Sequence, residues 1–193
     1  MADADDKFVV MGLAGSLRRG SMNRGLLLAA QEVAPDGVRV EIADIASLPH
    51  YNTDLDGDAA PDVVKAFCAQ MRRSHALLIA TPEYNHSIPG VLKNALDWAG
   101  SSRCKPSPPL RANPVAVLGA APGKSGTIRA QMALKTVLLA CKCHIMMTHD
   151  TYYQNAAPAF SDDGRVIDPQ VKKEMREILT GLRRWGDVVR SMK

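Results

Sequence analysis

The sequence predicts an α/β fold: a doubly wound, five-stranded parallel sheet in the strand order 2-1-3-4-5, with helices on both faces. Short, fully apolar runs alternate with longer amphipathic stretches, which is typical of β-α-β units. Five such apolar runs occur in the 193 residues, and five strands with intervening helices commonly adopt this order. Because no internal repeat or linker is present, residues 1–193 are expected to form a single domain.

The strand candidates are short and apolar; they are residues 8–14, 38–43, 76–80, 114–119 and 144–148. The helix candidates carry apolar residues at helical spacing; they are residues 23–33, 61–73, 89–100, 127–140 and 169 to about 192. In the third helix the apolar stripe should face the sheet, which places Asp97 and Trp98 nearer its edge. Residues 105–109 and 154–165 are predicted to be loops.

Composition and charge indicate an ordinary globular protein. Hydrophobic residues make up 46% and charged residues 23%, both near the average for soluble domains. The formal charge of +4 is spread along the chain, so it predicts no nucleic-acid binding, although it favours anionic ligands. No apolar run reaches the roughly 20 residues that span a bilayer, and residues 1–7 are acidic and polar rather than signal-like. We therefore expect a cytoplasmic protein that contacts no membrane.

The four cysteines predict reduced thiols. Their positions, 68, 104, 141 and 143, match neither a disulfide framework nor paired C-x-x-C zinc knuckles. Cys141 and Cys143 are two residues apart and precede His144, but so few clustered ligands make a poor zinc site. Core or edge packing is favoured over metal binding or redox sensing at these cysteines, and no metal ligand is predicted.

The loop after the first strand, residues 15–23 (loop 1), reads Gly-Ser-Leu-Arg-Arg-Gly-Ser-Met-Asn. Hydroxyls, backbone N–H groups and a helix N-terminus meet there, and together they suit a phosphate monoester held without metal. Arg18 could add a charge-assisted bond. The alternative is a Ser/Asn helix cap flanked by solvent-exposed arginines. The glycines at 12, 15 and 20 lack the G-x-G-x-x-G spacing of a Rossmann dinucleotide site.

The loop after the third strand, residues 81–90 (loop 2), reads Thr-Pro-Glu-Tyr-Asn-His-Ser-Ile-Pro-Gly. An aromatic ring, amide groups and a proline-stiffened backbone suit hydrogen bonding along the edge of a planar heterocycle. Glu83 is equally consistent with a turn or first-turn carboxylate. His86 is interpreted as a solvated loop histidine rather than a catalyst.

The loop after the fourth strand, residues 119–127 (loop 3), contains Gly-Lys-Ser and so invites comparison with a nucleotide-triphosphate loop. The comparison fails on spacing, because a Walker A motif requires a small residue where Leu118 stands, and Gly119 comes one residue late. A P-loop NTPase is therefore a remote alternative.

Three segments carry a resemblance to a known family. They are G-S-x-R-x-x-S-x-N at 15–23, P-E-Y-N-x-S at 82–87 running into L-K-N-A-L-D-W at 92–98, and loop 3. Together they resemble the NADPH-dependent FMN reductase family. That family includes chromate and quinone reductases, and the likeness extends from Val9 to the final helix. It implies a flavodoxin-like version of the fold, with FMN as cofactor and NADPH or NADH as co-substrate.

The resemblance also implies site residues. Those expected to hold the FMN phosphate are Ser16, Arg18, Ser21 and Asn23, with Met22 among the cofactor-binding residues. Those expected to line the isoalloxazine are Pro82, Glu83, Tyr84, Asn85 and Ser87, with Gly119 and Ala120 at its far side. The family often has Ser in place of Ala120 and two glycines in place of Gly126 and Thr127, which bears on acceptor preference. The residues that could contact the extra phosphate of NADPH are Arg18, Arg19, Lys124 and Arg129.

The implied activity is two-electron, ping-pong hydride transfer from NAD(P)H to quinones, with azo compounds, chromate or free flavin as further acceptors. The flavin carries the chemistry, so no catalytic side chain is predicted, and Tyr84 and Asn85 are the nearest candidates. A homodimer or homotetramer is implied as well. A flavodoxin-type electron carrier is the main alternative, although such carriers are usually acidic. A regulatory module that only retains the fold is a third possibility.

Overall fold

The computed structural model describes residues 7–148 and 151–192, and shows a parallel sheet between two layers of helices. The sheet order is β2-β1-β3-β4-β5, as predicted, with β6 also pairing with β4. The strands are β1 Phe8–Ala14, β2 Val38–Ile42, β3 Ala76–Ala80, β4 Pro114–Ala120, β5 His144–Ile145 and β6 Thr151–Tyr153. The α-helices are α1 Met22–Glu32, α2 Asp62–Arg73, α3 Gly90–Gly100, α4 Ile128–Ala140 and α5 Pro169–Ser191. Short 3-10 helices cover Thr53–Leu55, Gly57–Ala59 and Ala157–Ala159.

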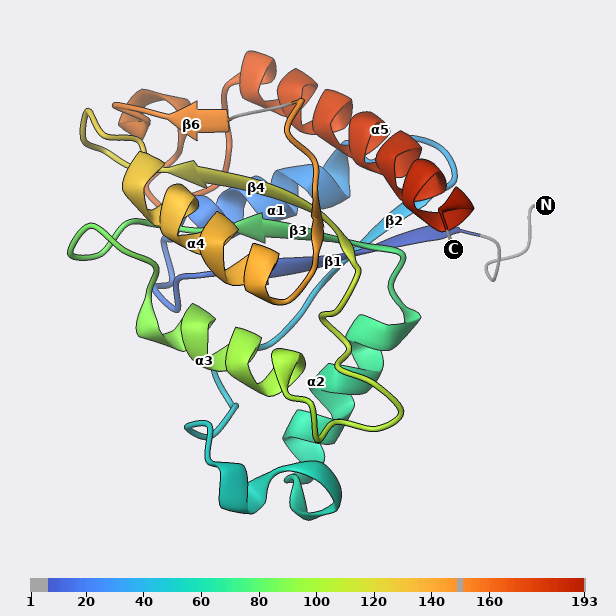
Figure 1. Cartoon of the computed structure of the whole chain (residues 1–193). Coiled ribbons are helices and arrows are strands. Elements are labelled where there is room, and N and C mark those ends of the chain that lie inside the picture. The colour runs from blue at the N-terminus through green and yellow to red at the C-terminus, as the bar shows by residue number, and fades with distance from the viewer. Residues whose placement is uncertain (1–6, 149–150, 193) are drawn as a thin grey trace.

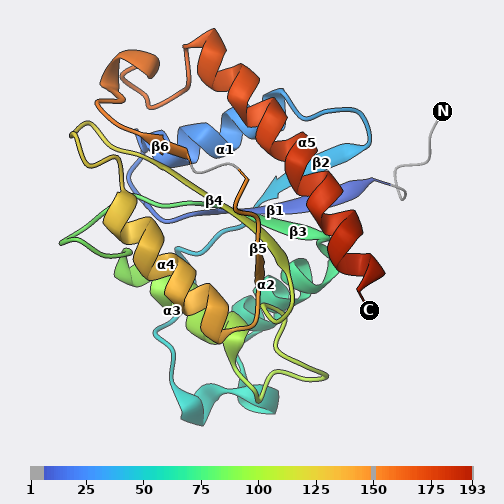
Figure 2. The same cartoon turned by 45° about the horizontal axis from the view of Figure 1, so that its top comes forward.

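The sheet separates two hydrophobic cores. Helices α1 and α5 cover one face and helices α2, α3 and α4 cover the other, as Figures 1 and 2 show. Every residue of β1 is buried, and its side chains alternate between the cores, as pleating requires: Val10 and Ala14 belong to the α1–α5 core, Met11 and Leu13 to the other. This two-sided burial explains why the central strands are apolar from end to end.

The fifth strand begins at His144, as predicted, but ends at Ile145 rather than at residue 148. The short strand β5 pairs with the start of β4, at Pro114 and Val115, and β6 then pairs with its end, from Leu118 to Ala120. Met146 is buried in the α1–α5 core, but the Met147 side chain is 59% exposed, so the chain leaves the sheet between the two strands. Residues 149 and 150 lie outside the described part of the chain.

Helix α3 contains one further correction. Trp98, expected near the edge of the helix, is 1% exposed and lies in the core. Its indole N–H donates to the Pro49 carbonyl at 2.8 Å, and Asn94 Nδ2 donates to the same oxygen at 2.9 Å. Asn94 Oδ1 also accepts from the Tyr51 N–H at 2.7 Å. The L-K-N-A-L-D-W motif therefore anchors the chain that follows β2.

Candidate active site

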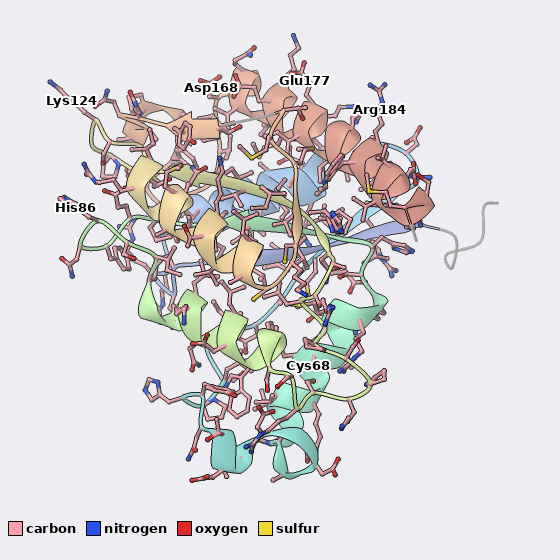
Figure 3. All side chains as sticks on the ribbon, viewed as in Figure 1. Cys68, His86, Lys124, Asp168, Glu177 and Arg184 are labelled. Atoms are coloured by element: carbon pink, nitrogen blue, oxygen red, sulfur yellow. The ribbon has the colours of Figure 1, made fainter. Side chains whose placement is uncertain are left out.

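Loops 1, 2 and 3 leave the same edge of the sheet, at the carboxyl ends of β1, β3 and β4. Figure 3 shows His86 of loop 2 and Lys124 of loop 3 projecting from this edge. The loops begin side by side, as two backbone hydrogen bonds show. The Gly15 N–H donates to the Ala80 carbonyl at 2.8 Å, and the Thr81 N–H donates to the Leu118 carbonyl at 3.0 Å. Ligands of open parallel sheets bind at such an edge, near the point where the strand order reverses.

Loop 1 forms a small polar cradle in front of α1. Ser21 is the N-cap, and its Oγ accepts from the Arg24 N–H at 3.2 Å. The Ser16 hydroxyl lies 3.4 Å from the Tyr84 hydroxyl, which connects loops 1 and 2. The backbone N–H groups of Met22 and Asn23, in the first turn of α1, have no hydrogen-bond partner among the described residues. These donors and the positive end of the helix dipole form a site suited to an anion.

Asn23 joins loop 1 to the end of β4. Its Nδ2 donates to the Ala120 carbonyl at 3.0 Å, and its Oδ1 accepts from the Ala120 N–H at 2.9 Å. Both residues are 3% exposed, so these bonds satisfy main-chain groups that water does not reach. The Asn23 side chain thus has a positioning role, and its backbone N–H is the group left for a ligand.

Loop 2 ends in a tight hairpin turn. Tyr84 and Ser87 exchange two backbone hydrogen bonds of 3.0 Å, and the two residues between them, Asn85 and His86, have φ values of 49° and 65°. Two consecutive positive φ angles define a type I′ turn, which Asn tolerates better than most residues. The Tyr84 side chain is 51% exposed, so a fixed backbone presents an accessible aromatic ring.

Glu83 fastens loop 2 to the start of α4. Its Oε1 accepts from Arg129 Nε and Nη2, both at 2.7 Å, and its Oε2 accepts from the backbone N–H groups of Arg129 at 3.0 Å and Ala130 at 3.2 Å. The carboxylate caps α4, whose N-cap residue, Thr127, makes no side-chain capping bond. Desolvation raises the pKa of Glu83, but the hydrogen bonds from Arg129 and Ala130 outweigh it and hold the pKa below its ordinary value.

Loop 3 packs closely against loop 2. A Cβ on Gly119 would overlap Thr127 Oγ1 and the Thr81 carbonyl, so no other residue fits there without a backbone shift. Thr127 is fully buried, has a φ of 72°, and accepts from Gln131 Nε2 at 3.1 Å. Gly119 and Ala120 therefore shape the floor of the site through their backbone.

A fourth segment, residues 151–166, borders the site and was not predicted to do so. The Ala121 N–H donates to the Tyr153 carbonyl at 3.0 Å, and the Asn155 N–H donates to the Gly123 carbonyl at 3.0 Å. A Cβ on Gly25 would overlap the Gly164 carbonyl, which places this segment directly against α1. A glycine inside a predicted helix was the available signal, because it often marks a close backbone approach.

The basic candidates differ in their contacts. Arg129 is paired with Glu83, and Arg18 Nη2 donates to the Gly20 carbonyl at 2.6 Å. Arg19 and Lys124 are exposed and have no hydrogen bond or ion pair with any described residue. Arg19, together with Arg18 and Arg24, lines a cavity of about 700 Å³ between loop 1 and residues 42–46.

Comparison with known proteins identifies the family. The model of a family described as NADPH-dependent FMN reductase matches residues 9–157. The chain belongs to this family. It is an NAD(P)H-dependent oxidoreductase with FMN as its cofactor. Membership decides against a flavodoxin-type carrier and against a P-loop NTPase.

Individual relatives agree with this result. The chain is 39% identical over 180 residues to an NAD(P)H-dependent FMN reductase of Pseudomonas aeruginosa, covering 93% of this chain and 96% of the relative. It is 37% identical over 161 residues to a quinone reductase of Pseudomonas putida, covering 83% and 86%. Among solved structures, FerB, a flavoenzyme NAD(P)H:(acceptor) oxidoreductase from Paracoccus denitrificans, superposes with a TM-score of 0.81 at 36% identity, covering 93% of this chain and 97% of FerB.

Two further findings concern metals and membranes. Within residues 7–148 and 151–192, no three His, Cys, Asp or Glu side chains are grouped so that they could hold a metal ion. No helix in the same ranges is both long and apolar enough to cross a bilayer.

Proposed function

We propose that this reductase holds FMN across loops 1, 2 and 3 and reduces quinone-type acceptors with NAD(P)H. The observation that carries the proposal is the polar cradle of loop 1, with its unpartnered backbone donors, next to the accessible ring of Tyr84. Relatives named quinone reductases support the acceptor class.

The phosphate end of FMN fits loop 1. The groups that would hold it are the hydroxyls of Ser16 and Ser21, the Arg18 guanidinium, and the backbone N–H groups of Met22 and Asn23. Charge-assisted bonds of this kind are the stronger class of hydrogen bond. An anion here also satisfies main-chain donors that otherwise lack a partner.

The ring end of FMN fits between loops 2 and 3. Pro82, Tyr84, Asn85 and Ser87 would line one side, and the backbone at Gly119 and Ala120 would border the other. Glu83 contributes by fixing the position of loop 2 against α4 rather than through a free carboxylate. Bound FMN would supply the two-electron redox chemistry between NAD(P)H and the acceptor. The chain orients the reactants, and no acidic or basic side chain is assigned a proton transfer.

Arg19 and Lys124 are the residues we propose for the extra phosphate of NADPH, because Arg18 is assigned to the FMN phosphate and Arg129 is paired with Glu83. The ratio of the KM values for NADPH and NADH in Arg19→Ala and Lys124→Ala tests each one. Loss of a phosphate contact raises the KM for NADPH and leaves the KM for NADH unchanged. Equal effects on both KM values would assign the residue no such contact.

We also propose a cytoplasmic homodimer or homotetramer. Ile128, Met132 and Leu139 lie on one face of α4 and are 43%, 57% and 65% exposed. An apolar row on an outer helix face is typical of a surface covered in the assembled protein.

The decisive experiment combines flavin content with turnover. We expect the purified protein to be yellow, to release FMN on heating, and to oxidise NAD(P)H when a quinone is added. Arg18→Ala should bind FMN at least several-fold more weakly, since one charge-assisted hydrogen bond contributes about 1.5–3 kcal/mol. Arg184→Ala is the control, because Arg184 lies on α5, away from the loop edge (Figure 3). Unchanged FMN affinity in Arg18→Ala would remove Arg18 from the site.

A further inference from the structure

Two cysteines line one cavity outside the flavin site. The cavity, of about 250 Å³, lies between α2 and the segment that follows α3, and its wall includes Cys68, Cys104, Arg72 and Lys105. Figure 3 shows Cys68 on the α2 side of the molecule, away from the loops that carry His86 and Lys124. The cofactor chemistry proposed above makes no use of these thiols.

Arg72 places a positive charge beside one of the two sulfurs. Its Nη2 lies 3.0 Å from Cys104 Sγ and also donates to the carbonyls of Lys105 at 2.6 Å and Ser107 at 3.1 Å. The guanidinium is therefore held at Cys104 by three contacts from one segment. The thiolate is the nucleophilic form of a cysteine, and the Arg72 guanidinium lies where it can donate a hydrogen bond to that sulfur as it reacts. Cys104 is also partly exposed, so a small oxidant can reach it.

Cys68 is the natural partner of Cys104. It lies in α2, is 1% exposed, and lines the same cavity as Cys104. Burial, reinforced by the neighbouring Cys104, raises the pKa of Cys68 to about 12. Cys68 is thus a protonated thiol at neutral pH, whereas Cys104 is partly exposed and lies beside a cation. This asymmetry matches the division between a resolving cysteine and an attacking cysteine.

We propose that Cys104 and Cys68 form a peroxide-reactive thiol pair that closes to a disulfide between α2 and the segment after α3. The Cys104 thiolate attacks one oxygen of hydrogen peroxide; the O–O bond breaks, and the departing hydroxide takes up a proton and leaves as water. Cys68 then attacks the sulfenic acid on Cys104, forming the S–S bond and breaking the S–O bond. The hydroxyl group of the sulfenic acid takes up the proton of Cys68 and leaves as a second water. Two thiols are oxidised and one peroxide is reduced.

The other two cysteines provide an internal control. Cys143 is buried and donates to the Leu110 carbonyl at 3.2 Å. Burial raises the pKa of both Cys141 and Cys143. No guanidinium contacts either sulfur within the described residues. These two thiols should therefore react with peroxide more slowly than Cys104.

The test is a peroxide titration of the reduced, full-length holoprotein, followed by non-reducing tryptic peptide mapping. We expect a cross-link between peptides 66–72 and 104–111, while Cys141 and Cys143 remain thiols. In Cys68→Ser the reaction should stop at a dimedone-reactive sulfenic acid on Cys104. In Cys104→Ser the buried Cys68 should stay reduced. FMN content, measured on the same samples, reports separately on the proposed flavin site.

Arg72 variants test the role of the charge. Arg72→Ala should slow formation of the link several-fold, and Arg72→Lys should restore part of the rate by keeping a cation. Circular dichroism of each variant shows whether the fold is intact. Either of two results would overturn the proposal: Cys68 and Cys104 remain thiols at a large excess of peroxide, or Cys141 oxidises before Cys104.

Discussion

At the scale of single residues, polar side chains in the site hold the loops together. Asn23 and Glu83 each make hydrogen bonds to backbone groups of another loop or helix. Buried main-chain donors and acceptors without partners are costly, so these two side chains fix the spacing between loops before any ligand binds.

Asn23→Ala should destabilise the protein even without FMN. The substitution leaves the buried N–H and C=O of Ala120 unpaired, at about 1–3 kcal/mol for each group. Urea unfolding of the apoprotein should show this loss of stability as a lower urea concentration at the unfolding midpoint. Asn85→Gly is the matched control, since Asn85 has a φ of 49°, which glycine adopts freely. An unchanged midpoint in Asn23→Ala would show that water replaces the lost bonds.

Glu83→Gln should remove part of the acid sensitivity of the fold. The pKa of Glu83 is lower in the folded chain than its ordinary value of 4.5, so its contribution is complete above that value and is lost as the pH falls through the folded pKa. The free energy of unfolding of wild type should exceed that of the variant by about 1–3 kcal/mol at neutral pH. This difference should disappear in acid. The measurement is the free energy of unfolding of both proteins across this pH range; a constant gap contradicts the prediction.

The sequence predicted that loops 1, 2 and 3 lie together at one edge of the sheet but not which contacts their side chains make there. Ser16, Arg18 and Ser21 lie in the predicted cradle, which follows from local order in one loop. The partner of Asn23 is 97 residues away, and the partners of Glu83 lie in another helix, so no local pattern could indicate either contact. The family resemblance pointed to Glu83 as a residue that lines the flavin, whereas the structure gives its carboxylate a capping role.

At the scale of elements, close helix packing depends on glycine. Gly186 lies inside α5, and a Cβ there would come within 2.5 Å of Phe8 Cζ. The guanidinium groups of Arg183 and Arg190 lie 5.2 and 5.3 Å from the centre of the same ring. The Phe8 side chain is therefore enclosed by one stretch of α5, and His75 stacks on it with ring centres 5.2 Å apart.

Gly186→Ala should destabilise the protein although alanine is the better helix former. The gain in helix propensity is about 1 kcal/mol, whereas overpacking a core typically costs about 1–3 kcal/mol. Gly90→Ala at the start of α3 provides the comparison, because no atom lies within 4 Å of an added Cβ there. Thermal unfolding should give a lower Tm for the first variant and an equal or higher Tm for the second.

Five strands and five helices follow from hydrophobic patterning, since each central strand is buried on both faces. The pattern could not predict that β5 ends at Ile145 or that β6 pairs with the end of β4. Thr151–Tyr153 is short and half-exposed, and it becomes a strand only because the end of β4 offers unpaired backbone groups. Tertiary pairing determines such a strand, and local propensity does not.

At the scale of the whole molecule, the apolar row on α4 lies next to the edge that carries loops 1, 2 and 3. Ile128 begins α4 directly after loop 3, and Met132 and Leu139 continue the row away from it. A second subunit on this face would therefore border the proposed flavin site, which is consistent with the assembly proposed above.

Met132→Glu should dissociate the proposed oligomer, because a carboxylate buried in an apolar interface without a partner is costly. Light scattering after size exclusion should give a multiple of 20.8 kDa for wild type and 20.8 kDa for the variant. Met192→Glu makes the same change at another exposed methionine and should leave the mass unchanged. A monomeric wild type would reject self-association altogether.

The contacts from Asn23 to Ala120 and from Glu83 to α4 belong to the polypeptide alone, so they persist when the flavin departs. With the loops already held in place, binding of FMN should require little reordering of the chain. We therefore expect the apoprotein to take up FMN without first unfolding.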